Sequence, residues 1–265
     1  MSELVLSEKS GRVLTLTINR PEALNALNQQ SLRELRKAVE AAARDPGVGC
    51  LILTGAGRAF CTGADLREVS ARYRAGDTEL GEDLRRNYAP LVRAIRACPR
   101  PVIAAINGTA AGAGLSLALA CDLRVAAAGA QLIVVFVRVG LVPDAGSLFF
   151  LTRTFGFSKA MQLALTGEPM PVEEAQTLGA IGAVVPAEQL MSTAVELATR
   201  IAEGPAEAYG LIKRGLERAL SLDLEQSLEL ESQLQTLAAR TGDHQEAVAA
   251  FLEKRKPGFG KERAR

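Results

Sequence analysis

The sequence has no tryptophan, a single histidine and almost no net charge, and each shortage argues against a class of function. With His244 as the only histidine, a zinc site built on histidine ligands is not expected. A net charge of +1 gives no broad basic field for nucleic acid, and an aromatic content of 4% gives no base-stacking surface. The cysteines show no paired spacing, so we expect reduced core thiols in a cytoplasmic protein. They are Cys50, Cys61, Cys98 and Cys121.

Long continuous apolar runs are also missing. Residues 101–121 carry no charge, but three glycines interrupt them, one in an Asn-Gly turn, and seven of these residues are alanine. A membrane-spanning helix needs about 20 predominantly apolar residues in one segment. We therefore expect a buried strand, a turn and a buried helix here, and no membrane partner. Residues 1–10 include two glutamates and a lysine, which is not the pattern of a signal peptide.

What the sequence does contain is an alternation of strand-like and helix-like segments, which predicts an α/β fold. Strands are expected at 13–19, 50–54, 102–106, 123–127 and 132–137. Leu32, Leu35, Val39 and Ala42 predict a helix that ends near Asp45-Pro46-Gly47; further helices are expected at 80–95 and 115–120. After about Pro186 the pattern becomes helical, at 187–202, 205–220, 222–239 and 243–255. No internal repeat is visible.

Two glycine-rich turns follow strand-like runs and lead into segments that can be helical. The first contains Gly63-Ala64-Asp65-Leu66 and the second Gly112-Ala113-Gly114. Helix starts carry free backbone N–H groups, and small residues let a ligand approach them. Two such turns could direct two N–H groups at one oxygen, as an oxyanion hole does. The alternative is that each turn only reverses the chain.

These turns belong to a set of motifs that resembles the crotonase superfamily, the enoyl-CoA hydratase/isomerase family. The motifs are Asn19-Arg20-Pro21 with Asn25-Ala26-Leu27, Phe60-Cys61-Thr62-Gly63-Ala64-Asp65-Leu66, Ile106-Asn107-Gly108 with Gly112-Ala113-Gly114, Cys121-Asp122-Leu123-Arg124, and the residues 251–259. The resemblance implies a spiral core of ββα units over residues 1–200. It also implies a C-terminal helical region, 201–265, that packs between subunits in a trimer or a dimer of trimers. The alternative is a tail that folds back on its own core.

The resemblance also implies where an acyl-CoA would bind. The backbone N–H groups of Ala64 and Ala113 are the implied donors to the thioester oxygen. The implied substrate- and CoA-binding residues are Ala23, Thr62, Gly63, Asp65, Leu66, Arg67, Gly112, Phe136 and Lys213. Arg67 and Lys213, together with Arg20, are candidates for the CoA phosphates, with plain surface charge as the alternative. The alternative role for Asp65 is to cap a helix.

The acidic residues decide which reaction is expected. Family hydratases use two glutamates, and by alignment those positions hold Ser116 and Phe136 here. Neither side chain takes up a proton near neutral pH, so hydration by two acids is not expected. Ser116 has no neighbouring His or Lys to activate it and receives no role. Asp144 remains, as a proton shuttle with a raised pKa or, alternatively, as a helix cap.

The sequence therefore predicts an acyl-CoA isomerase that uses Asp144 as its proton shuttle. By resemblance, it would move a double bond from the 3-enoyl to the 2-enoyl position, convert ring-1,2-epoxyphenylacetyl-CoA to an oxepin, or do both. The second reaction is that of the isomerases of the phenylacetate-degradation type. No metal or redox cofactor is implied, because CoA arrives with the substrate. Two alternatives remain open: an enoyl-CoA hydratase, and a non-catalytic acyl-CoA- or RNA-binding scaffold.

Overall fold

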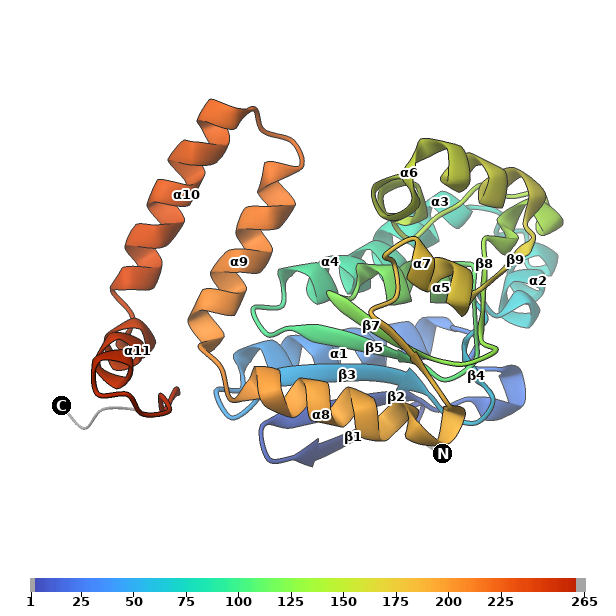
Figure 1. The fold of residues 1–265 in the computed structure, drawn as a ribbon. Helices are drawn as coiled ribbons and strands as arrows, with labels where there is room; N and C mark the ends of the chain where they lie inside the picture. The colour runs from blue at the N-terminus through green and yellow to red at the C-terminus, as the bar shows by residue number, and fades with distance from the viewer. Residues whose placement is uncertain (1–2, 261–265) are drawn as a thin grey trace.

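A computed structural model describes residues 3–260, in which two β-sheets contain the strands (Figure 1). The six-stranded sheet has the order β1-β2-β3-β5-β7-β10, and the four-stranded sheet has the order β4-β6-β8-β9. All neighbours are parallel except the pairs β1–β2 and β8–β9. The strands are β1 Val5–Ser10, β2 Val13–Ile18, β3 Cys50–Gly55, β4 Ala59–Cys61, β5 Val102–Ile106, β6 Thr109–Ala111, β7 Leu123–Ala127, β8 Gln131–Ile133, β9 Pro169–Pro171 and β10 Ala183–Val185.

The order of elements is a repeated ββα unit. In each unit one strand joins the larger sheet, the next joins the smaller sheet, and a helix follows. The units are β3-β4-α2, β5-β6-α5 and β7-β8-α6, where α2 is Leu66–Arg74, α5 is Ala113–Ala120 and α6 is Ser147–Thr166. This is the spiral that the resemblance implied. The chain leaves the larger sheet at the same edge in each unit. The loops that connect the two strands of a unit to its helix therefore lie together at that edge.

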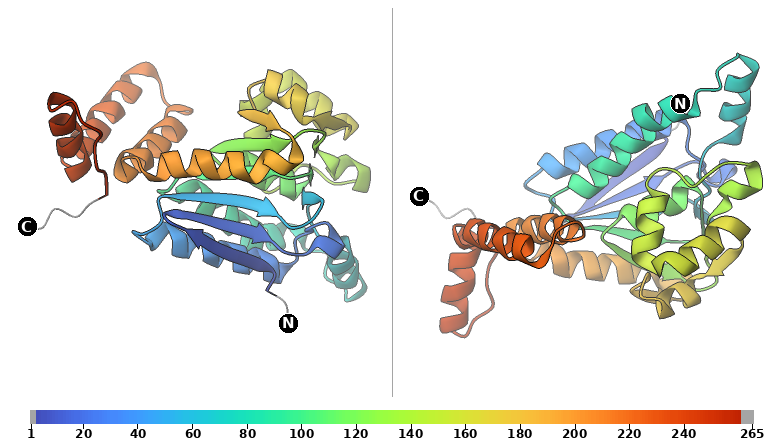
Figure 2. Two further views of the ribbon diagram at one scale, coloured as in Figure 1. Left: turned by 60° about the horizontal axis from the view of Figure 1, so that its bottom comes forward. Right: turned by 90° about the horizontal axis from the view of Figure 1, so that it is seen from above.

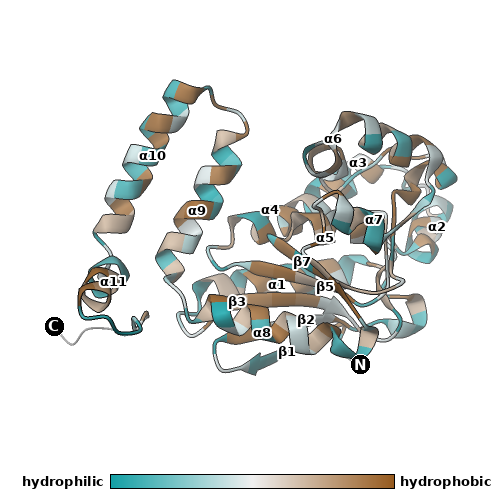
Figure 3. Cartoon of the chain, viewed as in Figure 1, coloured by the Kyte–Doolittle hydropathy of each residue, from teal (hydrophilic) through white to brown (hydrophobic). Residues whose placement is uncertain are grey.

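Both faces of the larger sheet are covered, because its central strands are apolar on both sides (Figure 3). Leu51, Leu53 and Ala104 belong to the main core, whereas the alternating Ile52 and Ile103 face a second, smaller core. Helix α8, Leu190–Ala202, covers that second face, along which it runs in Figure 2. On the other side lie α1, Gln29–Arg44, and α4, Ala89–Ala97.

Most of the elements expected from the sequence are present, with two differences. Helix α1 ends at Arg44 with Asp45 as its C-cap, where the sequence predicts the end, and it begins at a capping box on Asn28. The predicted helix 80–95 is α3, Leu80–Asp83, followed by a π-helical turn over Leu84–Tyr88 and by α4. The predicted strand 132–137 is wrong beyond Ile133, because Val135–Val139 forms a short 3-10 helix, η3. The remaining short elements are η1 Pro21–Ala23, α7 Val172–Thr177 and η4 Ala187–Gln189.

The last three helices extend away from the sheets (Figure 1). They are α9 Ala206–Ala219, α10 Leu224–Ala239 and α11 Gly242–Leu252, and α9 and α10 bury no residue fully. The turn at Gly204-Pro205 separates them from α8. The boundaries expected from the sequence, 1–200 and 201–265, extend beyond the described residues at both ends. Within residues 3–260, no helix has the length and apolar character to cross a membrane.

Candidate active site

The two glycine-rich turns touch each other. A side chain built on Gly63 would lie 3.3 Å from the backbone nitrogen of Ala113 and 3.6 Å from the Cα of Gly112. A side chain on Gly114 would lie 2.1 Å from the carbonyl oxygen of Cys61. Glycine is therefore required at 63 and 114 for the turns to approach this closely. Turns separated by about fifty residues in the sequence thus meet at one place.

The first turn leaves the N–H of Ala64 available. Ala64 forms an isolated parallel bridge with Leu27, in which Leu27 donates to Gly63 O at 2.7 Å and Asp65 donates to Leu27 O at 2.8 Å. Backbone N–H groups alternate in direction along an extended segment, so the N–H of Ala64 points away from Leu27. Within residues 3–260, none of the backbone hydrogen bonds outside helices and strands uses the N–H of Ala64 as its donor.

The second turn presents the N–H of Ala113. Gly112 adopts φ 52 and ψ −129, and Ala113 begins α5, all of whose residues are buried. The first N–H groups of a helix have no partner inside it. The N–H of Gly112 itself is taken, because it donates to Ile133 O at 3.0 Å. Ala64 and Ala113 therefore carry one candidate donor each at adjoining turns.

Asp144 is a half-buried carboxyl group held close to the second turn. Its backbone oxygen lies 3.1 Å from Ser116 Oγ, in the first half of α5. Its side-chain Oδ1 is buried and has no hydrogen-bond partner among the described residues. Burial, with a smaller contribution from the carboxylate of Asp83, raises the pKa of Asp144 to about 6. The capping alternative is wrong, because α6 is capped by Gly146 with no side-chain hydrogen bond.

The turn that carries Asp144 is strained. Ala145 adopts φ 49 and Gly146 adopts φ 87, so two consecutive residues have left-handed backbone conformations. For a residue with a Cβ this conformation costs roughly 1–2 kcal/mol. Ser147 N donates to Asp144 O at 2.8 Å and closes the turn. Strain that the surrounding structure maintains is typical of functional positions.

Asp83 is the second acidic group near Asp144, but it is held by partners. Its carboxylate accepts from Arg72 at 2.8 Å, and its other oxygen is bonded by Asn87. Tyr88 is also close: burial first, and then the charges of Asp144 and Asp83, raise its pKa. Asp83, Arg72 and Tyr88 were not predicted from the sequence as neighbours of the site. Tyr88 fitted the apolar face of a predicted helix, and no local pattern linked the others to Asp144.

Ser116 and Phe136 lie beside the same turn. Ser116 is fully buried, and Phe136 is buried with its ring 3.8 Å from where a side chain on Gly112 would lie. Phe136 belongs to η3 and not to a strand. Cys61 of the first turn is also fully buried, and burial raises the pKa of its thiol to about 12. A thiol with that pKa is no nucleophile near neutral pH.

The predicted binding residues of the first turn form a connected structure around it. Arg20 forms an ion pair with Asp65 at 2.8 Å, and Asp65 caps α2 by accepting from Arg67 N at 3.0 Å. Thr62 N and Thr62 Oγ1 both donate to Leu24 O at 3.2 Å, next to Ala23. Leu66 and Arg67 are exposed. Arg20 is therefore engaged in holding this loop, whereas Arg67 stays open.

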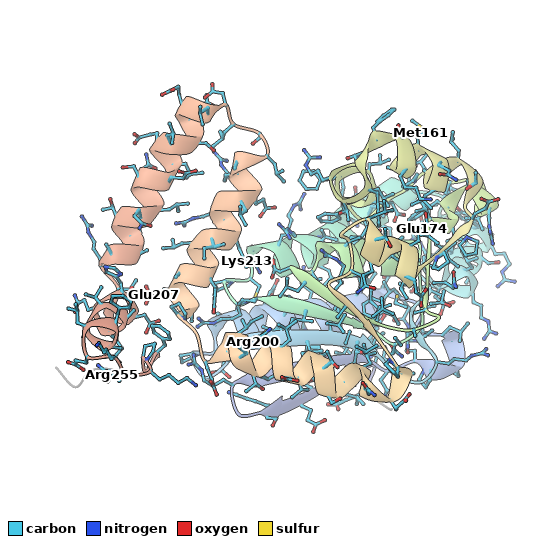
Figure 4. The ribbon with its side chains drawn as sticks, viewed as in Figure 1. Met161, Glu174, Arg200, Glu207, Lys213 and Arg255 are labelled. Carbon is cyan, nitrogen blue, oxygen red and sulfur yellow. The ribbon has the colours of Figure 1, made fainter. Side chains whose placement is uncertain are left out.

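Lys213 is not brought to the turns within this chain. It lies on α9 (Figure 4), forms an ion pair with Asp122 at 2.7 Å and donates to Arg100 O at 3.1 Å. Asp122 accepts from Val102 N, at the start of β5, whereas the second turn follows the end of that strand. Arg124, which is close to Asp122 in the sequence, donates instead to carbonyl oxygens of Cys121 and Ala180. Lys213 thus attaches α9 to the sheet.

Comparison with known proteins identifies the family. Residues 8–262 match the family model described as enoyl-CoA hydratase/isomerase. The chain is 42% identical to a 1,2-epoxyphenylacetyl-CoA isomerase of Escherichia coli over 259 residues, 98% of this chain and 99% of that protein. It is 38% identical, over the same shares of both chains, to a 2,3-dehydroadipyl-CoA hydratase of the same organism.

Solved structures give the same result for the fold. A crystal structure of an enoyl-CoA hydratase from Mycobacterium smegmatis has a TM-score of 0.91 at 32% identity, covering 98% of this chain and all of that one. One from Bacillus anthracis has a TM-score of 0.89 at 34% identity with the same coverage. The described turns, the spiral of ββα units and these matches along nearly the whole length lead to one conclusion: the chain belongs to the enoyl-CoA hydratase/isomerase family.

Proposed function

We propose that this protein is an acyl-CoA isomerase in which Asp144 moves the proton. The observation that carries the proposal is a half-buried carboxyl group with an unpartnered oxygen, on a residue whose backbone contacts Ser116 next to the turn that carries Ala113. A base with a pKa of about 6 is largely ionised at neutral pH and still basic enough to take a proton. The thioester oxygen would bind between the N–H groups of Ala64 and Ala113.

The proposed reaction balances without a further reactant. Asp144 removes a proton from the carbon next to the thioester carbonyl of a 3-enoyl-CoA, and the electron pair forms a dienolate. The two N–H groups stabilise the negative charge on the oxygen. Asp144 then returns the proton to the fourth carbon, and the double bond moves into conjugation. No electron is gained or lost, so the chemistry needs no redox cofactor.

The side chains around the turn favour isomerisation over hydration. Hydration by two acids would need carboxyl groups where Ser116 and Phe136 stand. Phe136 instead makes the site drier, which disfavours the addition of water. A dry site with an aromatic wall also suits a cyclic acyl group, and the relative from E. coli is named for such a substrate. We therefore propose both 3-enoyl-CoA and ring-1,2-epoxyphenylacetyl-CoA as substrates, in a reducing compartment such as the cytoplasm, where the buried free thiols persist.

The test is Asp144→Asn, assayed with 3-hexenoyl-CoA. We expect isomerisation to fall at least about 100-fold, as for the loss of a general base. Binding of hexanoyl-CoA, which cannot react, should change by less than about 3-fold because the oxyanion donors remain. Glu174→Gln is the matched control, since that exposed carboxylate on α7 is paired with Lys159 (Figure 4).

Two outcomes would contradict the proposal. Wild-type turnover by Asp144→Asn would remove Asp144 from the chemistry. Faster hydration of crotonyl-CoA than isomerisation of 3-hexenoyl-CoA by the wild type would favour a hydratase. Comparing kcat/KM for the straight-chain and the epoxide substrates then decides the acyl group. A salt-dependent RNA complex with no turnover of any enoyl-CoA would instead support a scaffold.

A further inference from the structure

We propose that Ser116 and Ser147 form a positioning pair that ties the second oxyanion donor to the catalytic acid. The inference rests on the proposed function, because it assigns these hydroxyls to the same site. Neither residue would touch the substrate. Each would act through a backbone group: the peptide that carries the N–H of Ala113, and the carbonyl of Asp144.

The two hydroxyls lie together in the core. Ser116 is 0% exposed and Ser147 is 2% exposed, and their oxygens are 2.5 Å apart. Ser116 Oγ also lies 3.2 Å from Gly112 O and 3.1 Å from Asp144 O. Carbonyl oxygens only accept, so the single proton of Ser116 is shared between Gly112 O and Asp144 O in a three-centre hydrogen bond, and Ser147 then donates to Ser116. This order uses both protons and leaves neither hydroxyl unpaired.

The contact with Gly112 reaches the oxyanion donor directly. Gly112 C=O and Ala113 N–H belong to the same planar peptide group. A hydrogen bond accepted by the carbonyl polarises that peptide and strengthens the N–H as a donor. It also fixes the orientation of a peptide that follows a glycine at φ 52. Ser116 therefore affects both the direction and the strength of the N–H.

The contact with Asp144 holds the backbone of a residue whose carboxyl oxygen Oδ1 has no hydrogen-bond partner among the described residues. Because no partner on that oxygen fixes the acid, the position of its backbone matters more. That backbone enters two left-handed residues, Ala145 and Gly146. Asp144 O receives Ser147 N at 2.8 Å as well as Ser116 Oγ, so both serines hold the same carbonyl. One buried pair thus fixes the acid relative to the oxyanion turn.

The experiment measures two readouts in Ser116→Ala, Ser147→Ala and the double variant. With 3-hexenoyl-CoA, each single variant should lose at least about 10-fold in kcat with KM nearly unchanged, less than the loss of a direct oxyanion donor. The double variant should be no worse than the poorer single variant, because the pair acts as one unit. Thr54→Val is the control: it removes a buried hydroxyl bonded to Ala105 O at 2.8 Å in the large sheet, and kcat should not change.

The second readout does not depend on turnover. The infrared carbonyl stretch of bound hexanoyl-CoA, labelled with carbon-13 at the thioester, reports how strongly the N–H groups polarise it. Ser116→Ala should reduce its shift to low frequency, whereas Asp144→Asn should keep it. If Asp144→Asn stays active while Ser116→Ala loses the shift, the proposed function fails. Of the inference, only the link between Ser116 and the oxyanion donor then stands, and the link to a catalytic acid fails with the proposed function. A folded Ser116→Ala with wild-type kcat and an unchanged shift overturns the inference, as would additive losses in the double variant.

Discussion

At the scale of the residue, two aspartates near the turns have opposite surroundings. Burial raises the pKa of Asp65, but hydrogen bonds from Arg20 and Arg67 outweigh it and leave that pKa below its usual value. Asp144 is buried without such partners, so its pKa rises. The stabilisation that this raised pKa of Asp144 provides is therefore complete below the unfolded pKa of about 3.8, and it is lost as pH rises through about 6. Asp144→Asn should consequently remain folded at pH 8.

The raised pKa of Asp144 predicts the pH dependence of the reaction. A general base acts in its ionised form, so kcat/KM should rise with pH and level off above a pKa near 6. The carboxylate of Asp83 contributes to this pKa after burial, and repulsion between like charges raises it. Asp83→Asn should therefore move the acid limb to lower pH.

The matched control for this prediction is Glu82→Gln. Glu82 precedes Asp83 but is engaged with Arg85 and Arg86 at the surface. The Glu82→Gln variant should therefore leave the pH profile of kcat/KM unchanged. An acid limb that stays in place in Asp83→Asn, in a variant that folds normally, would show that Asp83 does not act on the base.

At the scale of the element, the site depends on how closely β4 approaches the start of α5. A methyl group on Gly114 would lie 2.1 Å from Cys61 O and 2.8 Å from Cys61 Cβ, and the backbone cannot yield there without separating the turns. Gly114→Ala should lower kcat/KM by at least about 100-fold, because displacing a catalytic group by about 1 Å costs that much. Thermal unfolding should also occur at a lower temperature.

Gly81→Ala is the comparison for that variant. Gly81 lies in α3 with nothing within 4 Å of an added methyl group, so the change should leave activity intact. It should also raise stability slightly, since alanine favours helix over glycine. If Gly114→Ala were as active as Gly81→Ala, the close approach of the two turns would not matter for catalysis.

Elements whose ends carry local signals could be predicted from the sequence. Helix α1 has a regular apolar face and a breaking Asp-Pro-Gly, and its predicted end matched. The segment Val135–Val139 has β-branched residues typical of a strand, yet it turns as a 3-10 helix that ends at Gly140 with φ 69. The left-handed glycine and the hydrogen bond from Leu141 N to Phe136 O decide this, and the apolar pattern shows neither.

The candidate site, too, could be predicted from the sequence only in part. Ala64, Ala113 and Asp144 were predicted through motifs, because glycine-rich turns and an isolated acid are visible in the sequence. The Ser116–Ser147 pair and the effect of Asp83 on Asp144 were not. Their partners are 31 residues or more apart, and only the packing of α5 against the start of α6 brings the serines together. The spacing of residues along the chain does not indicate such a contact.

At the scale of the whole molecule, one chain exposes two separate apolar surfaces. Helices α9 and α10 form an apolar groove of about 710 Å³ between them. Ile212, Leu216 and Leu228 line it, and Leu216 is 68% exposed. A second group of exposed apolar side chains lies on η3, on α6 and on the loop between them, on the other side of the chain in Figure 1. It consists of Val139, Val142, Leu148, Phe157 and Leu165.

Two different apolar surfaces on one chain fit a closed ring, in which one surface of each subunit covers the other surface of its neighbour. We therefore expect light scattering to return about three or six times the 28.0 kDa of one chain. Leu216→Glu combined with Leu228→Glu should lower that mass, and so should Leu148→Glu combined with Leu165→Glu on the other surface. Gln233→Glu, on α10 but outside the groove, should not. A wild-type mass of 28.0 kDa would refute the ring, and a loss of mass from only one pair would indicate a contact between identical surfaces.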